Sequence, residues 1–368
     1  MKVLFYSNIP SPYRVDFYNE LGKKCDLTVL FELQDSTERD ENWKHDKFQH
    51  FKGIFLKGKR LTTDSAFCPE ITRYLKPKYD VIVFTVLTSP TALWAAAYLK
   101  MRRIPYYFEG DGGYAGSARG IKAAWKRFII AGTRGCFSTS AEFDHYCEVY
   151  GAGKDKIFRY PFTSVRRDDV LSTPLNLAQK RQKKQELGIS EDKMIISVGQ
   201  FIPRKGFDLL LKASKDFLED TGLYIVGGTP TEEYNEIIKQ LDLKRVHFIP
   251  FMSAEKLREY YRAADIFAFF TREDIWGLVV NEAMANGLPV VSTDRCIAAV
   301  ELIRNGENGY VIPTEDVEAM SRAVNSILEN PELRNKMAEN ALQKIREQYT
   351  IENMAEEHYR IFEENICM

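Results

Sequence analysis

Long hydrophobic runs are absent from this chain of 368 residues. No stretch of about 18 apolar residues occurs, which argues against a membrane-spanning helix. The first residues, MKVLFYSNIP, have one Lys but no apolar core followed by small residues, so we expect no secretory signal. The net charge is also low, because the 51 Lys and Arg residues are nearly balanced by 52 Asp and Glu residues. Without a global positive field, we expect no nucleic-acid partner.

Cysteine is sparse as well. The six cysteines are scattered and form no Cys-x-x-Cys pair: Cys25, Cys68, Cys136, Cys147, Cys296 and Cys367. This pattern favours reduced, mostly buried thiols in a cytoplasmic protein. The chain also lacks sequence repeats and low-complexity tracts. Its 45% hydrophobic and 28% charged residues are ordinary for a globular protein.

Short β-branched and aromatic runs recur along the chain, with helical patterns between them. Several runs are almost continuously apolar, as are strands buried on both faces of a parallel sheet. The alternation predicts an α/β protein built from right-handed βαβ units. The predicted strands are Val3–Ser7, Leu27–Phe31, Val81–Thr85, Pro105–Glu109, Cys136–Thr139 and Ile157–Phe162, then Met194–Val198, Tyr224–Val226, Val246–Phe248, Ile266–Phe270, Pro289–Thr293 and Gly309–Ile312.

The strand pattern restarts after a polar, charged stretch, Ser164–Lys193, which we interpret as a linker followed by a helix. At roughly 150 residues per domain, the length also predicts two domains. We place the first at 1–168 and the second at 169–345. Two doubly wound domains in succession usually bind a ligand in the crevice between them, at the carboxyl ends of strands.

The last segment, 346–368, contains one apolar helical stripe. His358 lies within it and is predicted to be a core or edge histidine. The members of the stripe are Ile351, Met354, Ala355, His358, Tyr359 and Phe362.

Two glycine-containing loops follow predicted strands of the second domain. Ser197–Ala213 places Arg204 and Lys205 where a loop meets a helix, and cations beside free backbone N–H groups favour a phosphate. The alternative is an ordinary loop with a solvated Arg-Lys pair. Ile225–Tyr234 carries Gly227-Gly228, which either lets a ligand approach the backbone or makes a tight turn.

The stretch Arg272–Val291, REDIWGLVVNEAMANGLPVV, carries Asp274 and Glu282 eight residues apart. A helix that begins near Gly277 would present free N–H groups beside Asp274. Glu282 would lie about a turn and a half along that helix, where a carboxylate can accept hydrogen bonds from a vicinal diol such as a ribose. The alternative is an exposed Glu. The apolar neighbours of Glu282 indicate a largely buried helix, in which an unpaired Glu would be costly.

These motifs resemble those of the retaining family-4 glycosyltransferases of GT-B architecture. The family has two acids separated by seven residues, then Ala-Met-Ala-x-Gly-x-Pro-Val-Val, and here AMANGLPVV follows Glu282. Its Gly-Arg-Leu-x-x-x-Lys-Gly loop is matched by Gly199–Gly206. VGGTP and FIPF, Phe248–Phe251, match two further turns. The resemblance is strongest from 193 to 313 and weaker before it.

The resemblance implies two Rossmann-like domains facing each other across a cleft, with the helix of 346–368 packing back on the first domain. It implies a nucleotide-sugar donor held by the second domain, with Lys205 on the diphosphate and Glu282 on the ribose. The acid at position 274 would contact hydroxyls of the transferred sugar. The implied donor-binding residues are Gly199, Gln200, Arg204, Lys205, Gly227, Phe251, Gly277, Leu278, Val279 and Glu282.

Two positions depart from the family pattern. Asp274 is one methylene shorter than the Glu expected there, and Glu273 stands beside it as a substitute. Gln200 replaces an Arg and removes a charge, which Arg204 could restore from a different angle. These changes predict a weaker grip on the diphosphate or a different donor.

The first domain would supply the acceptor side. Tyr13 and Arg14 follow its first strand and are candidate acceptor or phosphate contacts, or parts of a rigid loop. Glu109 and Asp111 are the polar groups available where many relatives carry a His. Their spacing also resembles the metal-binding Asp-x-Asp of the other glycosyltransferase architecture. We expect no metal and no cofactor, because GT-B enzymes offset diphosphate charge with cations and helix dipoles.

In the basic segment 117–135, the cations Arg119, Lys122, Lys126 and Arg127 accompany four apolar residues, Ile121, Trp125, Phe128 and Ile129. Such a helix either packs its apolar face on the sheet or lies on an anionic membrane. A lipid-linked acceptor would suit the second arrangement, at the inner face of a membrane.

The sequence therefore predicts glycosyl transfer from a nucleotide sugar to a hydroxyl of a glycan or lipid-linked acceptor, with retention, in polysaccharide or glycolipid synthesis. Lys205 would stabilise the leaving diphosphate, while Asp274, Glu109 and Asp111 would position hydroxyls. Two alternatives remain open. One is another nucleotide-sugar enzyme, an epimerase or hydrolase, and the other is a non-catalytic sugar-nucleotide-binding subunit.

Overall fold

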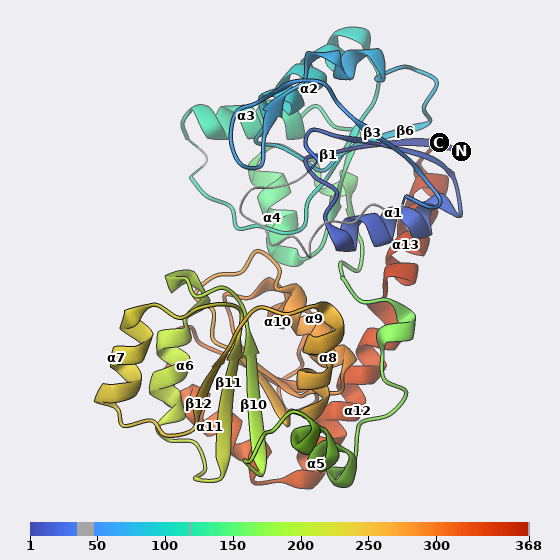
Figure 1. Cartoon of the computed structure of the whole chain (residues 1–368). Helices are drawn as coiled ribbons and strands as arrows, with labels where there is room; N and C mark the ends of the chain where they lie inside the picture. The colour runs from blue at the N-terminus through green and yellow to red at the C-terminus, as the bar shows by residue number, and fades with distance from the viewer. Residues whose placement is uncertain (35–47, 118, 367–368) are drawn as a thin grey trace. The chain divides into compact units, whose positions relative to one another are not determined.

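The chain forms two compact α/β units (Figure 1). The computed structural model describes residues 1–34, 48–117 and 119–366. The first unit comprises Met1–Ser164 with Thr350–Met368, and the second comprises Val165–Tyr349. The sequence expectation placed the domain boundaries after residues 168 and 345.

The first unit is built on a seven-stranded parallel sheet of order β3-β2-β1-β6-β7-β8-β9. Each strand predicted for this half is present, with ends that differ by a few residues. β3 was not predicted, because it is short, half-buried and weakly apolar. The strands are β1 (Lys2–Ser7), β2 (Asp26–Phe31), β3 (Lys52–Phe55), β6 (Val81–Phe84), β7 (Tyr107–Glu109), β8 (Gly135–Ser138) and β9 (Ile157–Arg159), with β4 (Lys59–Arg60) and β5 (Ala66–Phe67) in a small antiparallel pair.

Helices cover both faces of this sheet because its side chains alternate between two apolar layers. On β1, Leu4 and Tyr6 belong to the core that includes residues of α2, α3 and α4. Phe5 contacts Phe17 on α1 and Phe362 on α13 instead. The helices are α1 (Pro12–Gly22), α2 (Pro90–Arg102), α3 (Ile121–Ile130), α4 (Ala141–Val149) and α13 (Ile351–Ile366), with 3-10 turns η2 (Pro69–Arg73) and η3 (Lys154–Lys156).

The second unit contains a six-stranded parallel sheet of order β12-β11-β10-β13-β14-β15. The predicted strands of this half are all present. They are β10 (Lys193–Val198), β11 (Thr221–Val226), β12 (Val246–Ile249), β13 (Ile266–Phe269), β14 (Val290–Thr293) and β15 (Gly309–Ile312).

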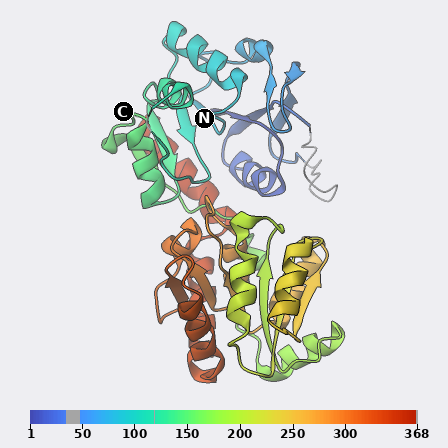
Figure 2. The ribbon, with the colours of Figure 1, turned by 90° about the vertical axis from the view of Figure 1, so that its left-hand side faces the viewer.

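Two helical layers enclose the second sheet. Figure 2 shows α11, α6 and α7 side by side over one face, where they bury a continuous apolar core. α5 with α8, and α9 with α12, cover the other face. The helices are α5 (Leu177–Glu186), α6 (Phe207–Ser214), α7 (Glu232–Gln240), α8 (Ala254–Ala263), α9 (Leu278–Ala285), α10 (Ile297–Leu302), α11 (Val317–Leu328) and α12 (Pro331–Gln348), with 3-10 turns η4 (Arg167–Asp169) and η5 (Pro203–Lys205).

The order of strands reverses direction between β1 and β6 in the first unit, and between β10 and β13 in the second. In open α/β sheets, ligands bind at the carboxyl ends of the strands beside such a switch point. The topology therefore directs attention to the loops after β1 and β6, and to those after β10 and β13.

The composition predicted reduced cysteines and no membrane-spanning helix. The cysteines within the described part of the chain are all free thiols, whereas Cys367 lies outside it. Across the described ranges, no helix combines the length and the apolar character needed to cross a bilayer.

Candidate functional site

The predicted donor-binding residues gather at the carboxyl edge of the second sheet. The loop after β10 carries Gly199–Gly206, and the loop after β13 leads through Asp274 to Gly277. Gly227 follows β11 and Phe251 follows β12. Because all the strands are parallel, these segments emerge at one edge.

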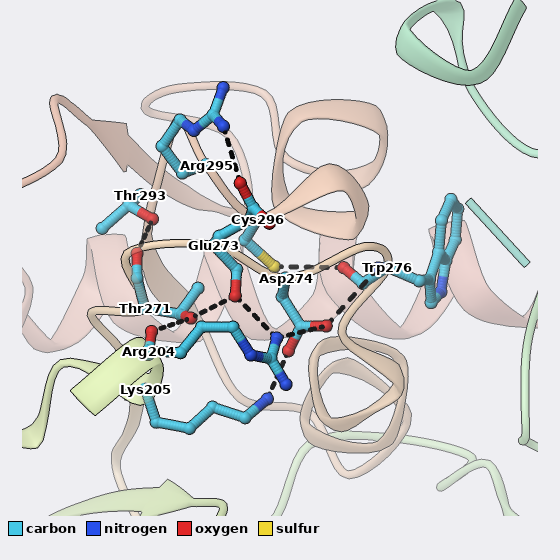
Figure 3. A network of polar contacts seen from close by, with 9 residues as sticks. All are labelled: Arg204, Lys205, Thr271, Glu273, Asp274, Trp276, Thr293, Arg295 and Cys296. Atoms are coloured by element: carbon cyan, nitrogen blue, oxygen red, sulfur yellow. Dashed lines mark hydrogen bonds and ion pairs between the residues drawn. The ribbon is translucent and has the colours of Figure 1, made fainter. Parts of the chain in front are cut away.

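Lys205 and Asp274 form the central contact of this edge (Figure 3). Lys205 Nζ donates to Asp274 Oδ2 at 2.5 Å. The two side chains are only 13% and 11% exposed. Lys205 Nζ also lies 5.0 Å from the centre of the Phe269 ring. The lysine predicted to bind phosphate is therefore held in place by the acid predicted to bind sugar.

Glu273 does not take the place of Asp274. Its carboxylate accepts a 2.9 Å hydrogen bond from Arg295 Nη2, and its carbonyl oxygen accepts one of 2.8 Å from Arg204 Nη1. Arg204 Nη1 also lies 3.9 Å from Asp274 Oδ1, so this exposed cation adds positive charge beside Lys205. Asp274 is consequently the acid that faces Lys205, as Figure 3 shows.

Gly277 opens α9 in a conformation that suits glycine. Its φ of 103° is in the left-handed region, and an added Cβ would lie 2.7 Å from Cys296 Sγ. Gly277 supplies no capping side chain, and no acid occupies the first turn of α9. The positive end of this helix dipole therefore remains available to an anion beside Asp274. Leu278 and Val279, predicted to contribute backbone amides, form this first turn.

Glu282 lies on α9, one turn beyond that end, and is half-buried. Tyr261 Oη, on the neighbouring α8, donates to Glu282 Oε2 at 3.4 Å. Burial, followed by the charge of Glu282, raises the pKa of Tyr261. The phenol therefore stays protonated as a donor that orients the carboxylate.

Other predicted donor residues have different surroundings. The carbonyl of Gly199 would lie 1.8 Å from a Cβ on Gly227, so the approach of two backbones already requires glycine there. Gln200 is exposed, and Phe251 is 44% exposed beyond β12. Gln200 and Phe251 thus leave surface at this edge that a ligand could contact.

The carboxyl edge of the first sheet contains a polar hollow of about 220 Å³. It lies at the switch point, because the loops after β1 and β6 line it. Tyr13, Arg14 and Asp111, three predicted residues, reach it, together with Asn8 and Thr85. Tyr13 Oη donates to Asp111 Oδ2 at 2.8 Å. The hollow is therefore lined by hydroxyl, amide and carboxylate groups.

Arg14 and Glu109 form a buried ion pair that the sequence did not predict. Arg14 is buried, and its two terminal nitrogens donate to Glu109 Oε1 and Asp111 Oδ1. Glu109 is 0% exposed, and its other oxygen lies 3.3 Å from His358 Nε2. Both carboxylate oxygens of the buried Glu109 thus have partners, so we correct the expectation that Glu109 positions a hydroxyl. Arg14 lines the polar hollow, and its contact with an acceptor or a phosphate stays a prediction.

The charge balance of this cluster keeps Glu109 ionised. Burial opposes ionisation, but the charges of Arg14 and then of His358 outweigh it and lower the pKa of Glu109 to about 2. Arg14 also bridges Glu109 and Asp111, which is where the Asp-x-Asp comparison would require a metal ion. A guanidinium thus performs the charge neutralisation between these two carboxylates.

The part of the chain that carries the donor-side residues is also the part that resembles known proteins. Residues 179–344 match the family model described as glycosyl transferases group 1. This part of the chain is therefore similar to the group 1 glycosyl transferases. An uncharacterized glycosyltransferase of Haemophilus influenzae is 34% identical over 179 residues, covering 47% of this chain and 50% of the relative. A D-inositol 3-phosphate glycosyltransferase of Corynebacterium efficiens is 30% identical over 222 residues, covering 57% of this chain and 51% of the relative.

Solved structures support the GT-B fold for this chain. HepE of Anabaena, in complex with UDP, has a TM-score of 0.80 and 16% identity, with 99% of this chain and 100% of that one covered. WaaG, a glycosyltransferase involved in lipopolysaccharide biosynthesis, has a TM-score of 0.71 and 18% identity, with 98% and 99% covered. By contrast, the chain spans about half the length of the curated relatives it matches.

Three contributors to these sites were missed by the sequence predictions. Tyr261 orients Glu282, Arg295 binds Glu273, and His358 contacts Glu109. His358 was predicted only as a core or edge residue, and it is indeed fully buried. Each contact joins residues at least 21 positions apart, so no local spacing could have identified them.

Proposed function

We propose that this protein transfers a sugar from a nucleotide-sugar donor to a hydroxyl of a glycan or lipid-linked acceptor, with retention of anomeric configuration. The observation that carries the proposal is the Lys205–Asp274 pair beside the uncapped start of α9, at the switch point of the second sheet. The structures of HepE with UDP and with UDP-glucose support a nucleotide sugar as the donor class. WaaG supports a role in cell-surface glycolipid or polysaccharide synthesis.

The proposed chemistry is electrostatic. Lys205, Arg204 and the first turn of α9 stabilise the negative charge that grows on the departing diphosphate. A front-face reaction requires no protein nucleophile, because a leaving phosphate oxygen helps to remove the proton from the acceptor hydroxyl. Glu282 accepts hydrogen bonds from the ribose, and Asp274 from the transferred sugar. We propose that these groups suffice without a metal ion.

The acceptor side is proposed to be the polar hollow of the first unit. Asp111 has a side chain that is 29% exposed, so one carboxylate there can meet an acceptor hydroxyl. Arg14 and Tyr13 fix the position of Asp111 and line the same hollow. The geometry suits alignment of a hydroxyl, which lowers the entropic cost of reaction.

The test combines binding with product analysis. Uridine, guanosine and adenosine diphosphates and their glucose and mannose conjugates are screened by thermal shift, because a bound ligand stabilises the folded state. The conjugate that binds is then incubated with and without a panel of hydroxyl acceptors. Lys205→Ala should reduce turnover by roughly 10²-fold with the fold intact. Lys212→Ala, an exposed lysine of α6, serves as the matched control and should retain turnover.

Other outcomes would point to the alternatives. Conversion of the donor without any acceptor would indicate an epimerase or hydrolase. Donor binding without turnover across the acceptor panel would indicate a non-catalytic binding subunit. Unchanged turnover of Lys205→Ala would refute the role of the lysine.

A membrane location at the inner face forms part of the proposal. α3 buries Ala123, Ile129 and Ile130, so one apolar face packs as an ordinary helix does. Ile121 and Phe128 remain exposed on its other side, at 86% and 40%. The segment is basic and carries no acid. We propose that this remaining surface contacts anionic lipid, the partner that a lipid-linked acceptor would require.

A further inference from the structure

Asp274 has a close, partly buried partner in Lys205. The hydrogen bond of 2.5 Å uses one of the three donors of the ammonium group. The remaining charge of the loop is limited, since Arg204 is the other cation and Gln200 is neutral. With Asp274 ionised, the formal charge of Arg204, Lys205 and Asp274 together is one positive unit. Asp274 therefore cancels half of the charge that a diphosphate would meet.

A nucleotide sugar and its spent nucleoside diphosphate differ in the charge that they place beside Asp274. In the nucleotide sugar, each phosphate has one ester bond, shares the bridging anhydride oxygen and carries one negative charge. Removal of the sugar leaves a terminal phosphate that can lose a further proton, with a pKa near 6. At neutral pH the spent nucleotide thus carries nearly one more charge, on the oxygen that held the sugar.

We propose that Asp274 makes the site select the sugar-bearing donor over the spent nucleotide, by competing with the terminal phosphate for Lys205. The inference rests on the proposed function, since it assumes that Lys205 meets the diphosphate. With the donor, the sugar separates the phosphate from Asp274 and offers hydroxyls to its carboxylate. With the spent nucleotide, two anions share one lysine, and their repulsion favours release of the product.

Two features make this role specific to Asp274. Its carboxylate is short and already hydrogen-bonded to Lys205, and Phe269 limits the movement of the lysine on another side. The adjacent Glu273 directs its carboxylate to Arg295 instead. Removal of the charge at 273 should therefore leave the competition for Lys205 intact.

The test is isothermal titration of Asp274→Asn with the spent nucleotide and with its sugar conjugate. The pair used is the one that the wild-type protein binds in the panel above. We expect the variant to bind the nucleoside diphosphate roughly tenfold more tightly, but the conjugate no more tightly, so that the selectivity collapses. In steady-state assays, the nucleoside diphosphate should inhibit the variant more strongly than the wild type. Thermal unfolding checks that the substitution leaves the fold intact.

Glu273→Gln is the matched control, because it removes the same charge one residue away. Equal gains in nucleotide affinity for both variants would show a general field effect and overturn the inference. Unchanged or weaker nucleotide binding by Asp274→Asn would also overturn it, while the proposed function would stand. When Lys205 is replaced by Ala, Asp274→Asn should no longer raise the affinity for the nucleoside diphosphate. A gain in affinity that persists without Lys205 would contradict the inference. If the wild-type protein binds neither a nucleoside diphosphate nor its sugar conjugate, the proposed function itself is refuted.

Discussion

Glu282 is the residue whose surroundings bear most directly on nucleotide recognition. It is half-buried on α9, and its carboxylate accepts a hydrogen bond from Tyr261. A vicinal diol matches such a carboxylate, since its two hydroxyls can donate to the two oxygens. The hydrogen bond from Tyr261 thus offsets part of the cost of burying the Glu282 carboxylate among apolar neighbours.

Glu282→Gln should weaken binding of the nucleoside diphosphate by roughly tenfold, because hydrogen bonds to a charged acceptor are worth more than those to an amide. Isothermal titration measures the change. The 2′,3′-dideoxynucleoside diphosphate is the control, since it lacks the hydroxyls that Glu282 would bind. An equal loss for both nucleotides would contradict the ribose contact. Tyr261→Phe should give a smaller loss in the same direction.

The identities of the donor-side residues followed from motifs, whereas their partners did not. Lys205 and Glu282 were predicted as donor-side residues because the loop and the helix that carry them have a recognisable local pattern. The pairing of Lys205 with Asp274 joins residues 69 positions apart, which no pattern within either loop could reveal. The pairing of Arg14 with Glu109 was missed for the same reason, because only packing shows that they neutralise each other.

Among the elements, α13 is the one whose place depends most on buried polar contacts. His358 stacks on Phe137 of β8 and contacts Glu109 at the end of β7. Its Nδ1 lies 2.8 Å from the carbonyl oxygen of Met354, which can only accept a hydrogen bond. The terminal helix is therefore fixed to the first sheet by a polar cluster as well as by its apolar stripe.

This cluster predicts a dependence of stability on pH. The pKa of Glu109 falls from 4.5 to about 2 in the folded protein. A carboxyl with a depressed folded pKa stabilises the fold fully above the unfolded value, and this contribution is lost as the pH falls from about 4.5 toward 2. The free energy of unfolding by urea should therefore drop by about 3 kcal/mol from this group across that range.

Glu109→Gln should be less stable at neutral pH and should lack this part of the acid dependence. Glu356→Gln provides the control on α13, because Glu356 forms an exposed ion pair with Lys24 that is worth little. Urea unfolding at pH 6, 5, 4 and 3 measures all three proteins. An acid slope that is the same in Glu109→Gln as in the wild type would exclude the proposed origin.

At the scale of the whole molecule, the exposed apolar surface of the first unit calls for an explanation. Met101 on α2 is 73% exposed and Ile121 on α3 is 86% exposed, and these two helices contact each other. Neither helix contains an acid, while Lys100 covers the Phe128 ring at 3.8 Å. Apolar side chains among cations, without acids, suit the surface of an anionic membrane.

The double substitution Ile121→Ser with Phe128→Ser should abolish sedimentation with phosphatidylglycerol-containing vesicles, because it removes apolar area that enters the interface. The wild type should bind these vesicles at low salt, less at high salt, and pure phosphatidylcholine hardly at all. Leu177→Ser is the matched control, since Leu177 is an exposed leucine on the basic helix α5. Equal binding of wild type and double variant would refute the membrane contact.

The sequence alone predicted the α/β class, nearly every strand, the loops that carry Lys205 and Asp274, and the helix that carries Glu282. It could do so because hydrophobic periodicity and glycine placement are local properties that the backbone must obey. Tertiary structure decided which charges meet. It paired Asp274 with Lys205, directed Glu273 to Arg295, and buried Arg14 against Glu109. Ionic contacts within a fold depend on which distant segments pack together, because the free energy of a charge is set by its burial and its neighbours.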